Sequence, residues 1–158
     1  MAHSQDLQPV DIDWKAIMAR HAAFEAKSAA LMPINKTALF EALAAAGISS
    51  VVVNFDGGGD SGQIESIEAL AGDTPAELPT DAISMICALP DGSGTETDTK
   101  PVGDVIESLA YELLTAAHPG WENNDGAYGE FLFDVAAGSI SLEHNDRYVA
   151  VESYSHEW

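Results

Sequence analysis

The sequence predicts an α+β domain in which an antiparallel sheet packs against two N-terminal helices and one central helix. Three segments place apolar residues at three- and four-residue spacing, which is typical of amphipathic helices. Other segments alternate apolar and polar residues, and short turns separate several of them, as antiparallel pairing requires. The chain of 158 residues fits one domain. We divide it into an N-terminal helical segment, 1–35, and an acidic α+β body, 36–158.

The helix predictions depend on apolar spacing and on capping residues. The first helix spans 11–32, begins at Asp11 or Asp13, and ends before Pro33. Its apolar stripe includes two residues that we assign to the core, Trp14 and Met18.

Two further helices follow the same rules. One spans 36–46, with Asn35 or Thr37 as its cap and Gly47 directly after its end. The other spans 104–117, carries an apolar stripe on one face, and is stopped by a Pro-Gly pair.

The first predicted strand, 48–55, places Val51, Val53 and Phe55 on one face. A glycine-rich loop follows, and residues 63–67 return antiparallel to complete a hairpin. The region 72–101 is expected to be mostly loop because turn residues cluster in it, with a possible buried strand at 82–89.

The C-terminal third is predicted to be a three-stranded meander. Residues 130–135 and 139–143 alternate in polarity, and Asn145-Asp146 turns the chain into a third strand at 148–154. A meander leaves one edge strand without a partner, and that edge can pair with a second copy. We therefore expect that 148–154 allows a homodimer.

The charge of the chain is strongly asymmetric. Six Lys and Arg residues stand against 26 Asp and Glu residues, which gives a net charge of −20. Residues 1–36 are neutral overall, so residues 37–158 carry the whole excess. Such a body repels nucleic acids and anionic membranes, because binding to phosphates requires Lys and Arg. The charge favours a basic protein partner, a multivalent cation, or solubility alone.

Other features of the composition limit the setting of the protein. The sequence contains no apolar run near the roughly 20 residues that span a bilayer. Its first residues lack the basic and apolar regions of a signal peptide. Cys87 is the single cysteine, which excludes a disulfide framework. We expect a cytoplasmic protein that does not bind membranes.

The glycine-rich loop is the first candidate site. A phosphate cradle needs a lysine or a helix N-terminus nearby, and no basic residue occurs between Lys36 and Lys100. The carboxylates of Asp56, Asp60 and Glu65 are instead the hard oxygen ligands that Ca²⁺ or Mg²⁺ prefers. The alternative is a hairpin turn with solvated aspartates.

The segment 121–130 is the second candidate site. Its spacing fails as an EF-hand, because Trp121 and Leu132 occupy positions that require carboxylates. We expect a turn followed by a strand, with a local carboxylate cluster, and a half-buried, hydrogen-bonded histidine at 144. The possible functional surface comprises Trp121, Glu122, Asn123, Asn124, Asp125, Glu130, His144 and Arg147.

The two segments VNFDGGGDSGQIE, 53–65, and GWENNDGAYGEF, 120–131, resemble the signature of an uncharacterised bacterial family. Its members are labelled as a domain of unknown function and are often found on plasmids and other mobile elements. The turn 144–148 and the Ser155-His156 tail resemble the same family, so the resemblance covers roughly 36–158. It implies no catalytic residues and no cofactor.

Two functions are compatible with these observations. The first is a non-catalytic acidic protein that binds a basic partner, and a mobile-element context fits a nucleic-acid mimic that occupies the basic groove of a host defence or DNA-processing enzyme. The second is a divalent-metal-dependent, hydrolase-like enzyme that uses Asp56, Asp60 and Glu65 together with Glu122, Asp125 or Glu130. The second function requires the two loops to meet in space.

Overall fold

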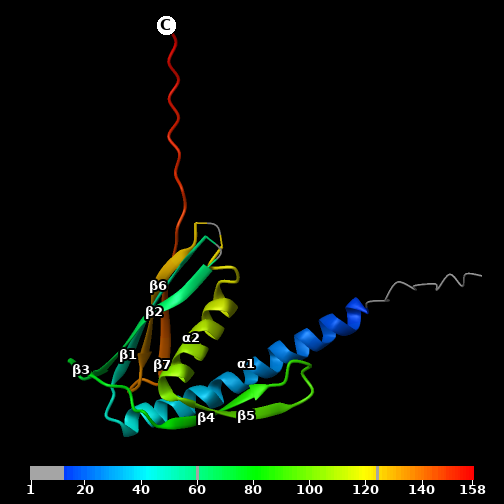
Figure 1. Ribbon diagram of the computed structural model, residues 1–158, viewed down its shortest axis with the longest axis vertical. Helices are drawn as coiled ribbons and strands as arrows, with labels where there is room; N and C mark the ends of the chain where they lie inside the picture. The colour runs from blue at the N-terminus through cyan, green and yellow to red at the C-terminus, as the bar shows by residue number, and fades with distance from the viewer. Residues whose placement is uncertain (1–12, 60, 124) are drawn as a thin grey trace, which may run out of the picture.

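The computed structural model describes residues 13–59, 61–123 and 125–158 (Figure 1). It confirms an α+β fold with two helices. The elements in chain order are α1 (Trp14–Ala45), β1 (Ser50–Gly58), β2 (Ser61–Ala71), β3 (Thr74–Ala76), β4 (Ala82–Ala88), β5 (Thr95–Pro101), α2 (Val102–Ala117), β6 (Ala127–Asp134) and β7 (Ser139–Asp146).

The strands form two antiparallel sheets. The larger has five strands in the order β3-β2-β1-β6-β7, and the smaller is the β4–β5 hairpin. Strand β1 is central in the larger sheet, where Val53 lies opposite Ile67 of β2 and Phe131 of β6. A bulge at Asn54 and Phe55 shifts the register between β1 and β2.

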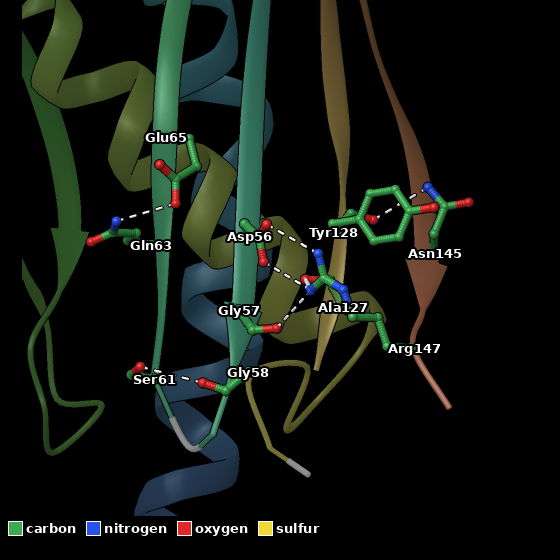
Figure 2. Close-up of polar contacts among 10 residues, drawn as sticks. All are labelled: Asp56, Gly57, Gly58, Ser61, Gln63, Glu65, Ala127, Tyr128, Asn145 and Arg147. Carbon is green, nitrogen blue, oxygen red and sulfur yellow. Dashed lines mark hydrogen bonds and ion pairs between the residues drawn. The ribbon is translucent and has the colours of Figure 1, made fainter. Parts of the chain in front are cut away.

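The core lies between one face of the five-stranded sheet and the helices. Strand β1 alternates in burial, so Val51, Val53 and Phe55 face inward as predicted. Strand β6 adds Phe131 and Phe133, and the ring of Phe133 meets Phe40 of α1 edge-on at 6.3 Å. Helix α2 covers the same face with its predicted apolar stripe. Figure 2 shows the helices behind the strands. The opposite face of the sheet carries the exposed residues of β6, Tyr128, Glu130 and Leu132, and we call it the uncovered face.

The two predicted N-terminal helices are one continuous helix, and the prediction that Pro33 ends the first was wrong. A proline inside a helix removes a hydrogen bond and costs about 3 kcal/mol. The β4–β5 hairpin holds α1 on both sides of this position. Lys27 donates to the carbonyl of Gly92 at 3.3 Å, and Asn35 pairs with Ile86 of β4. These contacts hold α1 in helical conformation on both sides of Pro33.

Asn35 is therefore not a helix cap but a buried link between α1 and β4. Its side-chain amide donates to the Ile86 carbonyl at 2.9 Å and accepts from the Ile86 amide at 2.9 Å. Among the capping predictions, Asp13 does cap α1, through a bond from the amide of Ala16, whereas Asp11 lies outside the described residues. Gly47 follows the helix with a positive φ of 78°, as expected.

The assignment of Trp14 and Met18 to the core was wrong. Their exposed fractions are 66% and 69%. The N-terminal half of α1 projects away from the five-stranded sheet (Figure 1), so no sheet lies against these side chains. Among the described residues, no helix is both long enough and apolar enough to cross a membrane.

The region 72–101 is mostly strand rather than loop. The apolar island became β4 as expected, but β3 and β5 were missed. Strand β5 reads Thr-Glu-Thr-Asp-Thr-Lys-Pro and is mainly exposed, so it lacks the apolar alternation on which strand prediction depends. The β-branched threonines at alternate positions were the available signal.

The predicted third strand of the meander is absent from the structure. Residues 148–158 form no secondary structure and are exposed. Strand β6 begins at Ala127, which pairs with Asp146, and the amide of Arg147 bonds to Gly126. Because residues after Arg147 do not pair with the outer side of β7, β7 is the edge strand of the five-stranded sheet.

Replacing Asn35 tests the link between α1 and β4. We expect Asn35→Ala to lower the free energy of unfolding by about 1–3 kcal/mol, because the Ile86 amide and carbonyl lose their partners. Thr37→Ala is the control on the same helix, since Thr37 is exposed and bonds only to Pro33, and it should change stability by at most about 0.5 kcal/mol. Urea denaturation measures both. Equal effects of the two substitutions would contradict the role of Asn35.

Candidate functional site

The two signature segments meet at one end of the five-stranded sheet. The indole of Trp121 lies on Gly57 and Gly62, which face each other at the end of the β1–β2 hairpin. A Cβ at Gly57 would lie 2.5 Å from the indole, and a Cβ at Gly62 would overlap it. Trp121 is 7% exposed and meets Phe55 edge-on at 5.6 Å. Glycine is therefore required at both positions, and we call Gly57 and Gly62 the glycine floor of Trp121.

A second close approach joins the loop before β6 to the same hairpin. Gly126 has a positive φ of 82°, and a Cβ there would collide with the carbonyl of Gly57. The carbonyl of Asp125 lies over Gly58. Here backbone packs on backbone, which only glycine allows. This contact explains glycines of both signature segments without any ligand.

Arg147 ties this end of the sheet together. Its guanidinium binds Asp56 through two hydrogen bonds, Nη1–Oδ1 at 2.8 Å and Nη2–Oδ2 at 3.0 Å (Figure 2). It also donates to the carbonyls of Gly57 and Ala127 and lies over the ring of Tyr128 at 4.7 Å. The hydrogen bonds to Asp56 raise the pKa of Arg147. One side chain thus joins β1, β6 and the chain after β7.

These contacts bear on the proposed metal ligands. Both carboxylate oxygens of Asp56 face Arg147, so an ion at Asp56 must compete with a guanidinium. Glu65 accepts a hydrogen bond from Gln63 at 3.2 Å (Figure 2). Asp60 lies outside the described residues. Within the described parts of the chain, no three His, Cys, Asp or Glu side chains are grouped to hold a metal ion.

The loops meet, as the enzyme hypothesis requires, but the expected carboxylate cluster is divided. Asp125 lines a depression of about 410 Å³ together with His118, Trp121 and Arg147. Glu130 instead lies on β6, directly opposite Glu143 of β7. A second depression of about 290 Å³ is lined by Asp56, Gly57, Gly58, Ser61, Gly62, Gln63 and Glu65.

His144 is half-buried and hydrogen-bonded, as the sequence predicts. Its side chain is 6% exposed, and its Nε2 lies 2.8 Å from Asp146. Its ring stacks on His118, with centroids 3.6 Å apart, and on Phe55 at 5.8 Å. Sequence analysis missed His118, because a residue just after a helix carries no periodic signal. The stack joins the end of α2 to the sheet.

Glu130, another residue of the predicted functional surface, lies on the uncovered sheet face. Cross-strand neighbours form rows on this face, and Glu130 lies between Asn54 and Glu143. The adjacent row contains Glu68, Val52 and Leu132. The side chain of Asn54 donates to Ser66 at 3.0 Å. In the described chain, Glu68, Glu130 and Glu143 form no ion pair.

The packing of Trp121 on the glycine floor leads to a direct prediction. We expect Gly62→Ala to lower the free energy of unfolding by about 2 kcal/mol, because the new methyl group displaces the indole of Trp121. Gly94→Ala is the matched control, since its nearest neighbour is the end of Leu89 at 3.5 Å, and its effect should stay within about 0.5 kcal/mol. Urea unfolding compares the two. A Gly62→Ala protein as stable as Gly94→Ala would contradict the packing.

Comparison with known proteins assigns the chain to a family. No curated protein and no solved structure matches the chain. A family model described as a family of unknown function, DUF6878, matches residues 31–158. This range contains both signature segments, Arg147 and the whole sheet, and it begins within α1. The match covers most of the sequence, so the chain belongs to the DUF6878 family of unknown function.

Proposed function

We propose that this protein is a non-catalytic cytoplasmic binding module whose uncovered sheet face engages a basic protein partner. The observation that carries the proposal is the pair Glu130 and Glu143. Like charges directly opposite each other on a sheet are destabilising, and Glu130 and Glu143 are such a pair. A third carboxylate, Glu68, lies on the same face in the adjacent row, two strands away from Glu130. A partner that supplies Lys or Arg to this face would relieve the repulsion.

Apolar groups at the centre of the face support binding over simple solubility. Leu132 and Tyr128 are 39% and 46% exposed on β6, next to the glutamates. Protein interfaces combine an apolar, aromatic centre with charged surroundings. Arg147 adds no free positive charge, because Asp56 pairs with it. The face is therefore suited to a partner that is both basic and partly apolar.

A basic nucleic-acid groove is the partner surface that we favour. Such grooves are lined with Lys and Arg that bind phosphates, and an array of carboxylates on a rigid sheet can occupy the same side chains. Complementary charge would also speed association at low salt. In this proposal the protein is a nucleic-acid mimic that inhibits or sequesters its partner.

The experiment compares two charge-matched triple variants as baits. Glu68→Gln/Glu130→Gln/Glu143→Gln removes carboxylates from the sheet face. Glu41→Gln/Glu96→Gln/Glu107→Gln removes the same number from exposed positions on α1, β5 and α2. We expect wild type and the second variant to retain one or more basic proteins at moderate salt, and the sheet-face variant to lose them. Quantitative mass spectrometry of the bound proteins measures this difference.

Competition with duplex DNA tests the mimicry. The retained protein should be released by DNA, because the two ligands would share one groove. Equal binding by both triple variants would show that net charge alone drives capture, and it would overturn the assignment of the sheet face. Retention that persists in excess DNA would contradict a nucleic-acid groove as the binding surface.

A further inference from the structure

We propose that residues 148–158, the C-terminal tail, add a strand to the open β7 edge of a second copy, so that two chains exchange tails in a symmetric dimer. The inference is independent of the acidic sheet face and concerns the backbone at the edge of the sheet. It rests on three features: the edge strand β7 has no strand on its outer side in the described chain, the C-terminal tail pairs with no strand, and the tail follows directly after β7.

Strand β7 is an unprotected edge. It is eight residues long and pairs only with β6, so its outer N–H and C=O groups have no strand beside them in the described chain. Exposed edges are usually blunted by shortness, proline or lysine. The opposite edge, β3, has three residues and contains Pro75. The sequence of β7, Ser-Ile-Ser-Leu-Glu-His-Asn-Asp, contains no proline or basic Lys or Arg.

The tail has a composition that favours β-strands, but it forms no secondary structure and is exposed. Its apolar residues are of the β-branched and aromatic types that favour strands, and they are almost fully exposed: Tyr148, Val149, Val151, Tyr154 and Trp158. It contains no proline or glycine. Exposure of so many large apolar side chains on one short segment marks an interaction site.

The geometry favours a second copy as the partner. The tail follows directly on β7, and Figure 1 shows it leaving the end of the sheet away from the body. A two-fold axis near Tyr148 and Val149 would set two such segments antiparallel. Residues 151–158 of one copy would then lie beside Ser139–Asp146 of the other, over the same length of eight residues. The contact is isologous and closed, as in common homodimers.

The charge of the chain predicts how salt affects this dimer. Each copy carries −20, so the two bodies repel each other, and added salt screens that repulsion. We expect dimerisation to strengthen with NaCl. Binding of a basic partner to the sheet face should weaken with NaCl, so the two proposals respond in opposite directions and can fail separately.

The test uses the full-length chain and two tail variants. In a strand, neighbouring N–H groups point to opposite sides, so Ala150→Pro/Val151→Pro removes one donor that faces the partner whatever the register. Ala150→Thr/Val151→Thr keeps both donors and the strand propensity. Light scattering over a concentration series, at low and high NaCl, gives the dimer fraction. We expect the proline variant to raise the dimer Kd by about tenfold or more and the threonine variant to stay near wild type.

Hydrogen exchange locates the contact. In the dimer, the amides of β7 and of residues 150–157 should exchange more slowly than in the proline variant, while thermal melts show that both variants keep the fold. A wild-type chain that stays monomeric at every concentration and salt would overturn the proposal. A dimer that survives the proline substitutions, or that leaves β7 exchange unchanged, would also overturn it.

Discussion

The rest of the structure depends on the packing of one tryptophan on two glycines. Trp121 covers Gly57 and Gly62, and no larger residue leaves room for its indole at either position. This contact holds the tip of the β1–β2 hairpin against the loop that leads into β6. Beyond the bulge at Asn54 and Phe55, β1 and β2 therefore stay paired up to Gly58 and Ser61, at the end where Arg147 closes the sheet.

This packing changes the interpretation of the two segments 53–65 and 120–131. Glycines and aspartates in conspicuous loops suggest a metal or a phosphate, but here the glycines allow close backbone contacts and Asp56 pairs with Arg147. In this chain the glycines and Asp56 of the two segments therefore hold the end of the sheet together. Within the part of the chain that the structure describes, the features without a partner lie elsewhere, on the uncovered face around Glu130, along the edge strand β7 and on the tail that follows it. Both are suited to binding other proteins.

Local patterns predicted much of the fold and long-range contacts decided the rest. Alternation found the buried faces of β1 and β6, and helical spacing found α2. Proline punctuation failed at Pro33, because Asn35 and Lys27 anchor the helix to a hairpin distant in sequence. Of the candidate site, the sequence analysis placed Trp121, His144 and Arg147 on a possible functional surface, whereas the structure buries Trp121. Their roles were not predictable, because the partners Gly62, His118 and Asp56 come from other elements.

The fluorescence of Trp121 tests the central packing claim most directly. The other two tryptophans, Trp14 and Trp158, are exposed, so Trp14→Phe/Trp158→Phe leaves Trp121 as the single tryptophan without changing the residues that pack on it. We expect blue-shifted emission, weak quenching by acrylamide, and loss of both properties in one transition with global unfolding. Emission and quenching like those of free tryptophan in the folded protein would show that the indole does not lie on the glycine floor, and the account would be wrong.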